Sequence, residues 1–334
     1  MKRSILATLT AALAAGAAIA QQVPEPVQPP PHTSPWPILG TGQTEGIRTA
    51  SLALGPELER GRSAKEMLAD KRKFDAALAA LRPQRPGTVD AYVVAVALDS
   101  DAVFAREARE AGRVLTRRYD SEGRSLTLAG PDGKSAELPR GSIGSLTLAL
   151  ARIAELMDPK EDVLILFATS HGAPEGLAYH YGDTGYGVLS PYRLAGVLAE
   201  LGIERRILLL NACFSGVFVP YLATRDTAIL TAAAADRASF GCDAENDWTF
   251  FGDALVNNAM RKPASLTAAA AEAHRMVAQW EVEGAIEPSL PQVRVGDGVH
   301  AWLTALEARM PRSATAPVGT PSVASLERIG RAAR

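Results

Sequence analysis

Short and almost wholly apolar runs alternate along this chain with runs whose apolar residues recur at helical spacing. The apolar runs are AYVVAVAL (91–98), DVLILFAT (162–169), RILLL (206–210) and AILT (228–231). The helical patterns lie at 67–81, 104–115, 146–157, 194–201 and 266–280. Apolar runs of this length are typical of strands that are buried on both faces of a parallel sheet. Their order with the helical segments predicts an α/β fold with helices on both faces of the sheet.

The length and the composition shifts divide the chain into parts. The 334 residues suit one large α/β domain with appendages. We expect a signal peptide (1–20), a Pro-rich linker (21–40), a helical N-terminal segment (41–88), a packed domain (89–310) and a disordered tail rich in Ser, Thr, Ala and Pro (311–334). The sequence leaves open whether the helical segment is a propeptide or part of the body.

The N-terminus has the pattern of a secretory signal. Lys2 and Arg3 precede an apolar run over 5–19, and small residues end at Ala20 before two glutamines. The run is short for a membrane span, which needs about 20 apolar residues. We therefore expect cleavage after Ala20 and a periplasmic or secreted protein with no transmembrane segment, an uncleaved anchor being the alternative.

Charge and metal-binding residue types exclude several classes of function. The formal net charge is −2, so the chain lacks the basic field by which proteins hold nucleic acid. Two cysteines are too few for a disulfide scaffold, and the five histidines form no zinc-finger spacing. His171 and His180 are nine residues apart, which is not a helical metal-binding register. We expect no metal or organic cofactor.

Two reactive residue types follow two successive predicted strands. Ser170-His171-Gly172 comes after one apolar run, and Asn211-Ala212-Cys213 comes after the next. The carboxyl ends of parallel strands meet at one edge of a sheet, about 4.8 Å apart for neighbours. We expect Cys213 as a nucleophile, His171 as the general acid/base, and the backbone N–H of Gly172 in an oxyanion hole.

Each of these signals has a plainer interpretation. A single cysteine at a strand end is often a small buried apolar residue, and a His-Gly pair is often only a turn. Ser215 as the nucleophile is not indicated, because no G-x-S-x-G turn surrounds it. The interpretation as a thiol site depends on both residues following successive strands.

The two motif blocks resemble a known family. ILFATSHG (165–172) followed by LLLNACFSG (208–216) is similar to the legumain (asparaginyl endopeptidase) family of cysteine peptidases, which has the caspase-like fold, and the resemblance extends over 91–299. It implies a three-layer α/β/α sandwich with a mainly parallel six-stranded sheet. It also implies His171 as general acid/base, Cys213 as nucleophile, and a peptide or protein substrate. The expected function is that of an exported cysteine endopeptidase.

A third block extends the resemblance. ADRASFGC (235–242) and TFFGD (249–253) are similar to the family segment that lines the S1 pocket. The resemblance implies Ser239 and Asp253 as substrate-binding residues and a preference for Asn or Asp at P1. The plainer alternatives are a turn hydroxyl for Ser239 and a helix-start residue for Asp253.

The chain also departs from the family pattern. Ser170 stands where legumains have Asp, no Arg-His pair occurs in 99–106, and we expect no self-inhibiting C-terminal prodomain. These departures leave strict Asn specificity open. A transpeptidase or amidase using the same two residues, and a catalytically silent binding protein of this fold, remain alternatives. Cys242 is either a free structural cysteine or a disulfide partner that would silence Cys213.

Overall fold

The computed structural model describes residues 29–130 and 138–326. The predicted signal peptide (1–20), residues 21–28 of the linker, residues 131–137 and residues 327–334 of the tail lie outside the described residues. The helices are α1 (Glu45–Ala53), α2 (Ala64–Ala79), α3 (Ala102–Arg118), α4 (Ile143–Leu156), α5 (Pro191–Glu200), α6 (Val219–Leu222), α7 (Phe250–Gly252), α8 (Leu266–Gly284) and α9 (Val299–Glu307). The strands are β1 (Glu57–Glu59), β2 (Ala91–Ala97), β3 (Ser125–Leu128), β4 (Val163–Thr169), β5 (Gly172–Ala173), β6 (Gly176–Tyr181), β7 (Gly185–Leu189), β8 (Arg206–Asn211), β9 (Thr227–Thr231) and β10 (Gln292–Val295). Shorter helical turns are η1 (Ser215–Phe218), η2 (Asp253–Asn258), η3 (Ala259–Arg261) and η4 (Ser322–Ser325).

A six-stranded sheet forms the centre of the molecule. Its order is β10-β9-β8-β4-β2-β3, and all neighbours are parallel except β10, which runs antiparallel to β9. The four apolar runs of the sequence are β2, β4, β8 and β9. The predicted mainly parallel six-stranded sheet is therefore confirmed, and the sheet is mixed because of its last strand.

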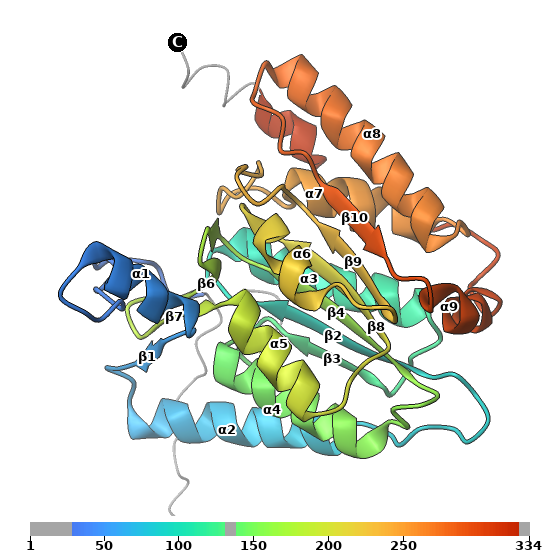
Figure 1. The fold of residues 1–334 in the computed structure, drawn as a ribbon, viewed down its shortest axis with the longest axis horizontal. Coiled ribbons are helices and arrows are strands. Elements are labelled where there is room, and N and C mark those ends of the chain that lie inside the picture. Colours follow the sequence, from blue (N-terminus) through green and yellow to red (C-terminus); the bar gives the residue numbers. More distant parts are fainter. Residues whose placement is uncertain (1–28, 131–137, 327–334) are drawn as a thin grey trace, which may run out of the picture.

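Alternate residues of the central strands β2, β4, β8 and β9 contribute to two separate cores. In β4, Ile165 and Phe167 face the core that includes residues of α3, α8 and α9. Leu164 and Leu166 face the opposite core, with residues of α4 and α5. Figure 1 shows α8 on one side of the sheet and α2, α4 and α5 on the other. The apolar runs are continuous because both faces are covered, so the predicted α/β/α layering is confirmed.

Local sequence signals set the helix ends that lead into the sheet. Ser190 caps α5, its Oγ accepting a hydrogen bond from the Arg193 N–H at 3.1 Å, and Pro191 occupies the first helical position. Gly202 follows the helix with φ 65°, a left-handed conformation that favours glycine. Ser190 and Pro191 thus begin α5, and Gly202 ends it shortly before β8.

A second, antiparallel sheet lies beside the main one and was not expected from the sequence. Its order is β1-β7-β6-β5, and it follows directly on the loop that carries His171. The glycine-rich sequence 172–187 shows little alternation of apolar and polar residues, which is why pattern reasoning missed these strands. Leu58 of β1 pairs with Tyr186 of β7, so part of the segment 41–88 is built into this sheet (Figure 1).

The C-terminal segment also contacts the body, where the sequence predicts a disordered tail. The Val318 N–H donates to Asn257 Oδ1 at 2.9 Å, and the Val318 carbonyl accepts from Trp248 Nε1 at 2.8 Å. Further on, the Ser322 N–H donates to Asp253 Oδ2 at 2.7 Å. These contacts arise between side chains far apart in sequence, so the composition of 311–326 does not reveal them.

Among the helices of residues 29–130 and 138–326, none has both the length and the apolar composition that a membrane span requires.

Candidate active site

The His171 and Cys213 loops start from paired points on neighbouring strands. Thr169, the last residue of β4, pairs with Asn211, the last residue of β8. Each reactive residue lies two positions further along its own chain. A Cβ on Gly172 would lie 2.0 Å from the Cys213 carbonyl oxygen, so the two loops are in direct contact and only glycine fits there. The structure thus brings His171, Gly172 and Cys213 together.

The turn after Cys213 has an unfavourable backbone conformation. Phe214 has φ 57°, in the left-handed region that non-glycine residues seldom adopt. Such a conformation costs about 1–3 kcal/mol and persists where the surroundings hold it. Here the Phe214 N–H donates to the Arg237 carbonyl at 2.8 Å, and η1 begins at the next residue. The turn ends the strand abruptly and leaves Cys213 half-buried at the sheet edge.

Hydrogen-bond donors and a nearby imidazole surround the Cys213 thiol. The side chain of Cys242 hydrogen-bonds to Cys213, and the Ser239 N–H donates to the Cys213 sulfur at 3.2 Å. The Cys242 hydrogen bond is the largest cause that lowers the pKa of Cys213 to about 6; the Ser239 N–H and the charge of His171 add to it, while burial opposes it. Conversely, the pKa of Cys242 is raised, first by this hydrogen bond and then by burial. Both cysteines are free thiols.

His171 is oriented by a carboxylate and by an aromatic ring. Its Nε2 lies 3.2 Å from Oδ2 of Asp101, and its ring packs edge-on against Phe104 at 4.9 Å between centroids. Burial lowers the pKa of His171, but the hydrogen bond to Asp101 and the charges of Asp99, Asp101 and Cys213 outweigh it, so the pKa is raised. The His171 side chain is 43 % exposed, which leaves it accessible from solvent.

The buried carboxylate of Glu107 joins the end of β4 to the end of β8. Thr169 Oγ1 and Asn211 Nδ2 both donate to Glu107 Oε2, and Thr249 donates to Oε1 through its N–H and its hydroxyl. Glu107 is fully buried on α3, and burial raises its pKa to about 7. This network fixes the strand ends relative to each other and to the start of α7.

The two predicted substrate-binding residues are placed differently. Ser239 is 8 % exposed and adjoins the thiol through its backbone. Asp253 is 1 % exposed, and its oxygens accept from Asn257, Asn258 and the Ser322 N–H. The carboxylate of Asp253 is thus engaged with the C-terminal segment, whereas Ser239 belongs to the surroundings of Cys213.

Sequence reasoning missed three acidic residues of this region. Asp99 and Asp101 follow β2, a third parallel strand, and so reach the same edge of the sheet as His171. Two carboxylates directly after a buried strand were the available signal. For Glu107, the signal was a charged residue within the apolar face of a helix, beside Phe104 and Ala108.

Two groups of side chains place potential metal-ligand atoms together. One group is His32, Asp99 and His180, and the other is Asp99, Asp101 and His171; within each, the ligand atoms lie within 4.8 Å of one another. Burial is the main cause that raises the pKa of Asp99 to about 6.

Comparisons with known proteins bear on this arrangement. The crystal structure of caspase-1 from Spodoptera frugiperda is similar over 62% of this chain and 85% of that chain, at 16% identity and a TM-score of 0.40. A sequence comparison with curated proteins gives no match. The family model described as Peptidase C13 family, the legumain family, matches residues 146–301, a range that contains His171, Cys213, Ser239 and Asp253. This match supports a cysteine-type peptidase acting on protein substrates, and it confirms the resemblance of the chain to the legumain family.

Proposed function

We propose that this protein is an exported cysteine endopeptidase in which Cys213 is the nucleophile and His171 the general acid/base. The observation that carries the proposal is the meeting of these residues at adjoining strand ends, with Gly172 against the Cys213 carbonyl. A pKa of about 6 keeps most of the thiol ionised at neutral pH, and the thiolate is the reactive form.

The contacts suggest how the proton moves. Asp101 engages Nε2 of His171, so Nδ1 remains for exchange with the thiol. The Cys213 sulfur attacks the scissile carbonyl carbon, and backbone N–H groups of Gly172 and Cys213 stabilise the resulting oxyanion. His171 then protonates the leaving amine, which departs as the carbon–nitrogen bond breaks. Water, deprotonated by His171, attacks the thioester, releases the acid product and regenerates Cys213.

Substrate selection is assigned to the segment that adjoins the thiol. Ser239 offers a hydroxyl, which can donate to or accept from a carboxamide or carboxylate side chain at P1. A preference for Asn or Asp at P1 is therefore part of the proposal. Asp253 contributes to it only by exchanging its contacts with Asn257, Asn258 and Ser322 for contacts with the substrate.

Export is proposed from the N-terminal sequence. Lys2, Arg3 and the apolar run 5–19 would direct secretion, with cleavage after Ala20. N-terminal sequencing of the protein recovered from the periplasm or medium tests this part separately from the chemistry.

The experiment for the peptidase activity is cleavage of a peptide library by the purified protein, with product masses recorded. We expect internal cleavage, concentrated after Asn or Asp, and a loss of at least about 10³-fold in Cys213→Ala. His300→Ala, on the exposed face of α9, is the control and should keep the original rate, whereas Cys242→Ala should lower the rate at neutral pH because Cys242 holds down the pKa of Cys213. Full activity of Cys213→Ala would overturn the assignment. Ser239→Ala and Asp253→Ala, profiled on the same library, tell which residue sets P1.

The masses of the products also distinguish hydrolysis from transfer of the acyl group to an added amine. With an added amine, hydrolysis alone gives free carboxylate products, and a transpeptidase gives the amide of the added amine. If the amide is the main product, the reaction at Cys213 is transfer to an amine and not peptide-bond hydrolysis.

A further inference from the structure

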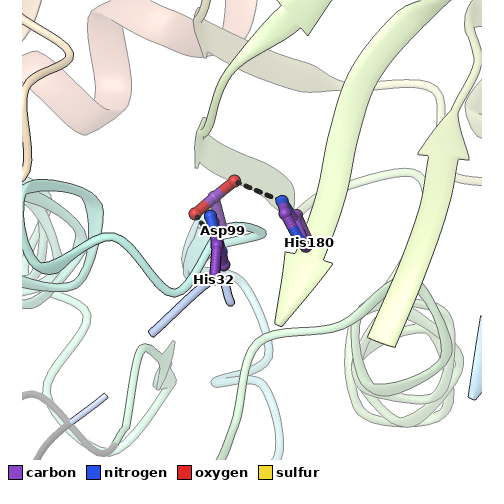
Figure 2. Close-up of side chains that lie close together, drawn as sticks. All are labelled: His32, Asp99 and His180. Carbon is purple, nitrogen blue, oxygen red and sulfur yellow. Dashed lines mark ion pairs between the residues drawn. The ribbon is translucent and has the colours of Figure 1, made fainter. Parts of the chain in front are cut away.

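Three segments that are far apart in sequence bring two imidazoles to one buried carboxylate. His32 comes from residues 29–38, here termed the N-terminal strap; Asp99 follows β2, and His180 lies in β6. His32 Nε2 is 3.4 Å from Asp99 Oδ1, and His180 Nδ1 is 4.0 Å from Asp99 Oδ2. Figure 2 shows the two rings lying one against the other with the Asp99 carboxylate at their edge.

The carboxylate and one imidazole of this cluster have unmet bonding capacity. The Asp99 side chain is 1 % exposed, and its Oδ2 accepts no hydrogen bond from the described residues. The buried Nε2 of His180 likewise has no hydrogen-bond partner among them, although the ring nitrogen that faces Asp99 is Nδ1. Leaving buried polar atoms without a partner is costly, so the cluster is incomplete as it stands.

The separations within the cluster fit atoms that share an ion. Both imidazole–carboxylate distances, 3.4 and 4.0 Å, are longer than a good hydrogen bond. Two ligands at zinc bond lengths of about 2.0–2.2 Å in a tetrahedral site are roughly 3.3–3.6 Å apart. The three ligand atoms can therefore share one ion when the side chains move closer and one ring turns.

We propose that His32, Asp99 and His180 form a binding site for a divalent transition-metal ion of the Zn²⁺ class. Two imidazoles and one carboxylate are a ligand set that this class of ion prefers, with a fourth position left for water. Binding requires one ring to turn, because the two rings are 13° from parallel with centroids 3.4 Å apart and cannot both aim in-plane at one ion. His32 is the ring that turns, since it is on the strap. In turning it gives up its contact with Ser100 Oγ, its ion pair with Asp101 at 3.9 Å and its stacking on His180.

An ion at this site would join the N-terminal strap to the edge of the sheet that carries His171. The strap already contacts this edge: the Ser100 hydroxyl donates to the Pro30 carbonyl, and the N–H groups of Thr33 and Ser34 donate to Asp183. Asp99 is two residues before Asp101, which contacts His171. The metal site therefore holds the strap beside the candidate active site.

The experiment is titration of the purified full chain with Zn²⁺ and with Co²⁺ as a spectroscopic substitute. Cys213→Ala is the background, so that the reactive thiol beside His171 cannot act as a ligand. We expect one equivalent to bind with the visible spectrum of four-coordinate cobalt and without a thiolate-to-cobalt band. Co²⁺ should also quench Trp36, whose ring lies 5.0 Å from that of His180, and Trp36→Phe should remove this quenching.

Ligand variants locate the ion. His32→Ala and His180→Ala should each weaken binding roughly 10- to 100-fold or more, the range known even for indirect partners of metal sites. His300→Ala, on the exposed face of α9, is the matched control and should leave affinity unchanged. His32 is partly exposed on the strap, so its variant tests the site without disturbing the core.

Two results would overturn the proposal. One is the absence of stoichiometric binding at micromolar metal. The other is binding that His171→Ala abolishes and that His32→Ala and His180→Ala leave intact, because the ion would then occupy the group Asp99, Asp101 and His171. Since all readouts are of binding, their failure is distinguishable from a failure of the proposed peptidase activity.

Discussion

His171 Nε2 lies 3.2 Å from Oδ2 of Asp101, the carboxylate that follows the neighbouring strand β2. The imidazole is thereby held at one of its two nitrogens. The pKa of Asp101 is lowered, the hydrogen bond to His171 being the largest cause, so the carboxylate stays ionised beside the ring. The candidate site thus consists of three side chains that follow three adjacent parallel strands, β2, β4 and β8.

Replacing Asp101 by Asn should lower kcat by roughly 10²- to 10⁴-fold with little change in KM. An amide in this place favours the wrong tautomer of His171 and no longer stabilises the imidazolium. Steady-state kinetics on a cleaved peptide measure both constants. Asp297→Asn, at an exposed aspartate beyond β10, is the control and should retain the original rate. An unchanged kcat in Asp101→Asn would show that the contact has no part in the reaction.

Removing the Cys242 thiol should raise the pKa of Cys213. The hydrogen bond from Cys242 is the largest cause that holds this pKa at about 6, so Cys242→Ala should move it toward the ordinary value of 9.0. The rate of iodoacetamide alkylation against pH reports the thiolate fraction, and its midpoint should shift to higher pH. Cys242→Ser keeps a donor and should restore part of the shift, while Cys213→Ala supplies the blank. Coinciding profiles for the original protein and Cys242→Ala would refute the prediction.

A methyl group on Gly172 should impair both folding and activity. It would lie 2.0 Å from the Cys213 carbonyl oxygen, so the loops must move apart. We expect Gly172→Ala to lose about 1–3 kcal/mol of stability, as in overpacked sites, and about 10²-fold in rate, because a shift of about 1 Å misplaces the reacting groups. Thermal unfolding and kinetics measure the two effects.

Gly196 provides the matched control for that substitution. It lies in α5 and has nothing within 4 Å of an added Cβ. Gly196→Ala should keep full activity and gain up to about 1 kcal/mol, the helix preference of Ala over Gly. Equal effects at the two glycines would contradict the steric argument.

The buried Glu107 should make the free energy of unfolding depend on pH. Its pKa is raised from 4.5 to about 7, so the folded state binds the proton more tightly than the unfolded chain. Stability from this group is then fully present below about pH 4.5 and declines as pH rises to about 7, by roughly 3 kcal/mol. Urea unfolding across this range should show the decline in the original protein and not in Glu107→Gln. The exposed Glu122→Gln should keep it, and an equal decline in Glu107→Gln would disprove the role of the carboxyl group.

The fold was largely predictable because its strands are buried on both faces. β2, β4, β8 and β9 appear in the sequence as continuous apolar runs, and the helices between them carry their own spacing and caps. The small sheet β1-β7-β6-β5 was not predictable in the same way, since a glycine-rich hairpin and a three-residue strand carry little periodic signal. The contacts of 311–326 with Asn257 and Asp253 depend on long-range packing, which composition cannot express.

The sequence by itself determined that a histidine and a cysteine follow two buried strands, because apolar periodicity locates strand ends and parallel strands end at one edge. Only the tertiary structure decided what surrounds them. Asp101 and Glu107 reach the site from the start and the interior of α3, and Cys242 reaches it from a distant loop. The same holds for His32, Asp99 and His180, whose spacing along the chain suggested no metal site. Bonding distances depend on the folded arrangement of distant segments, and local sequence patterns encode only the elements that are brought together.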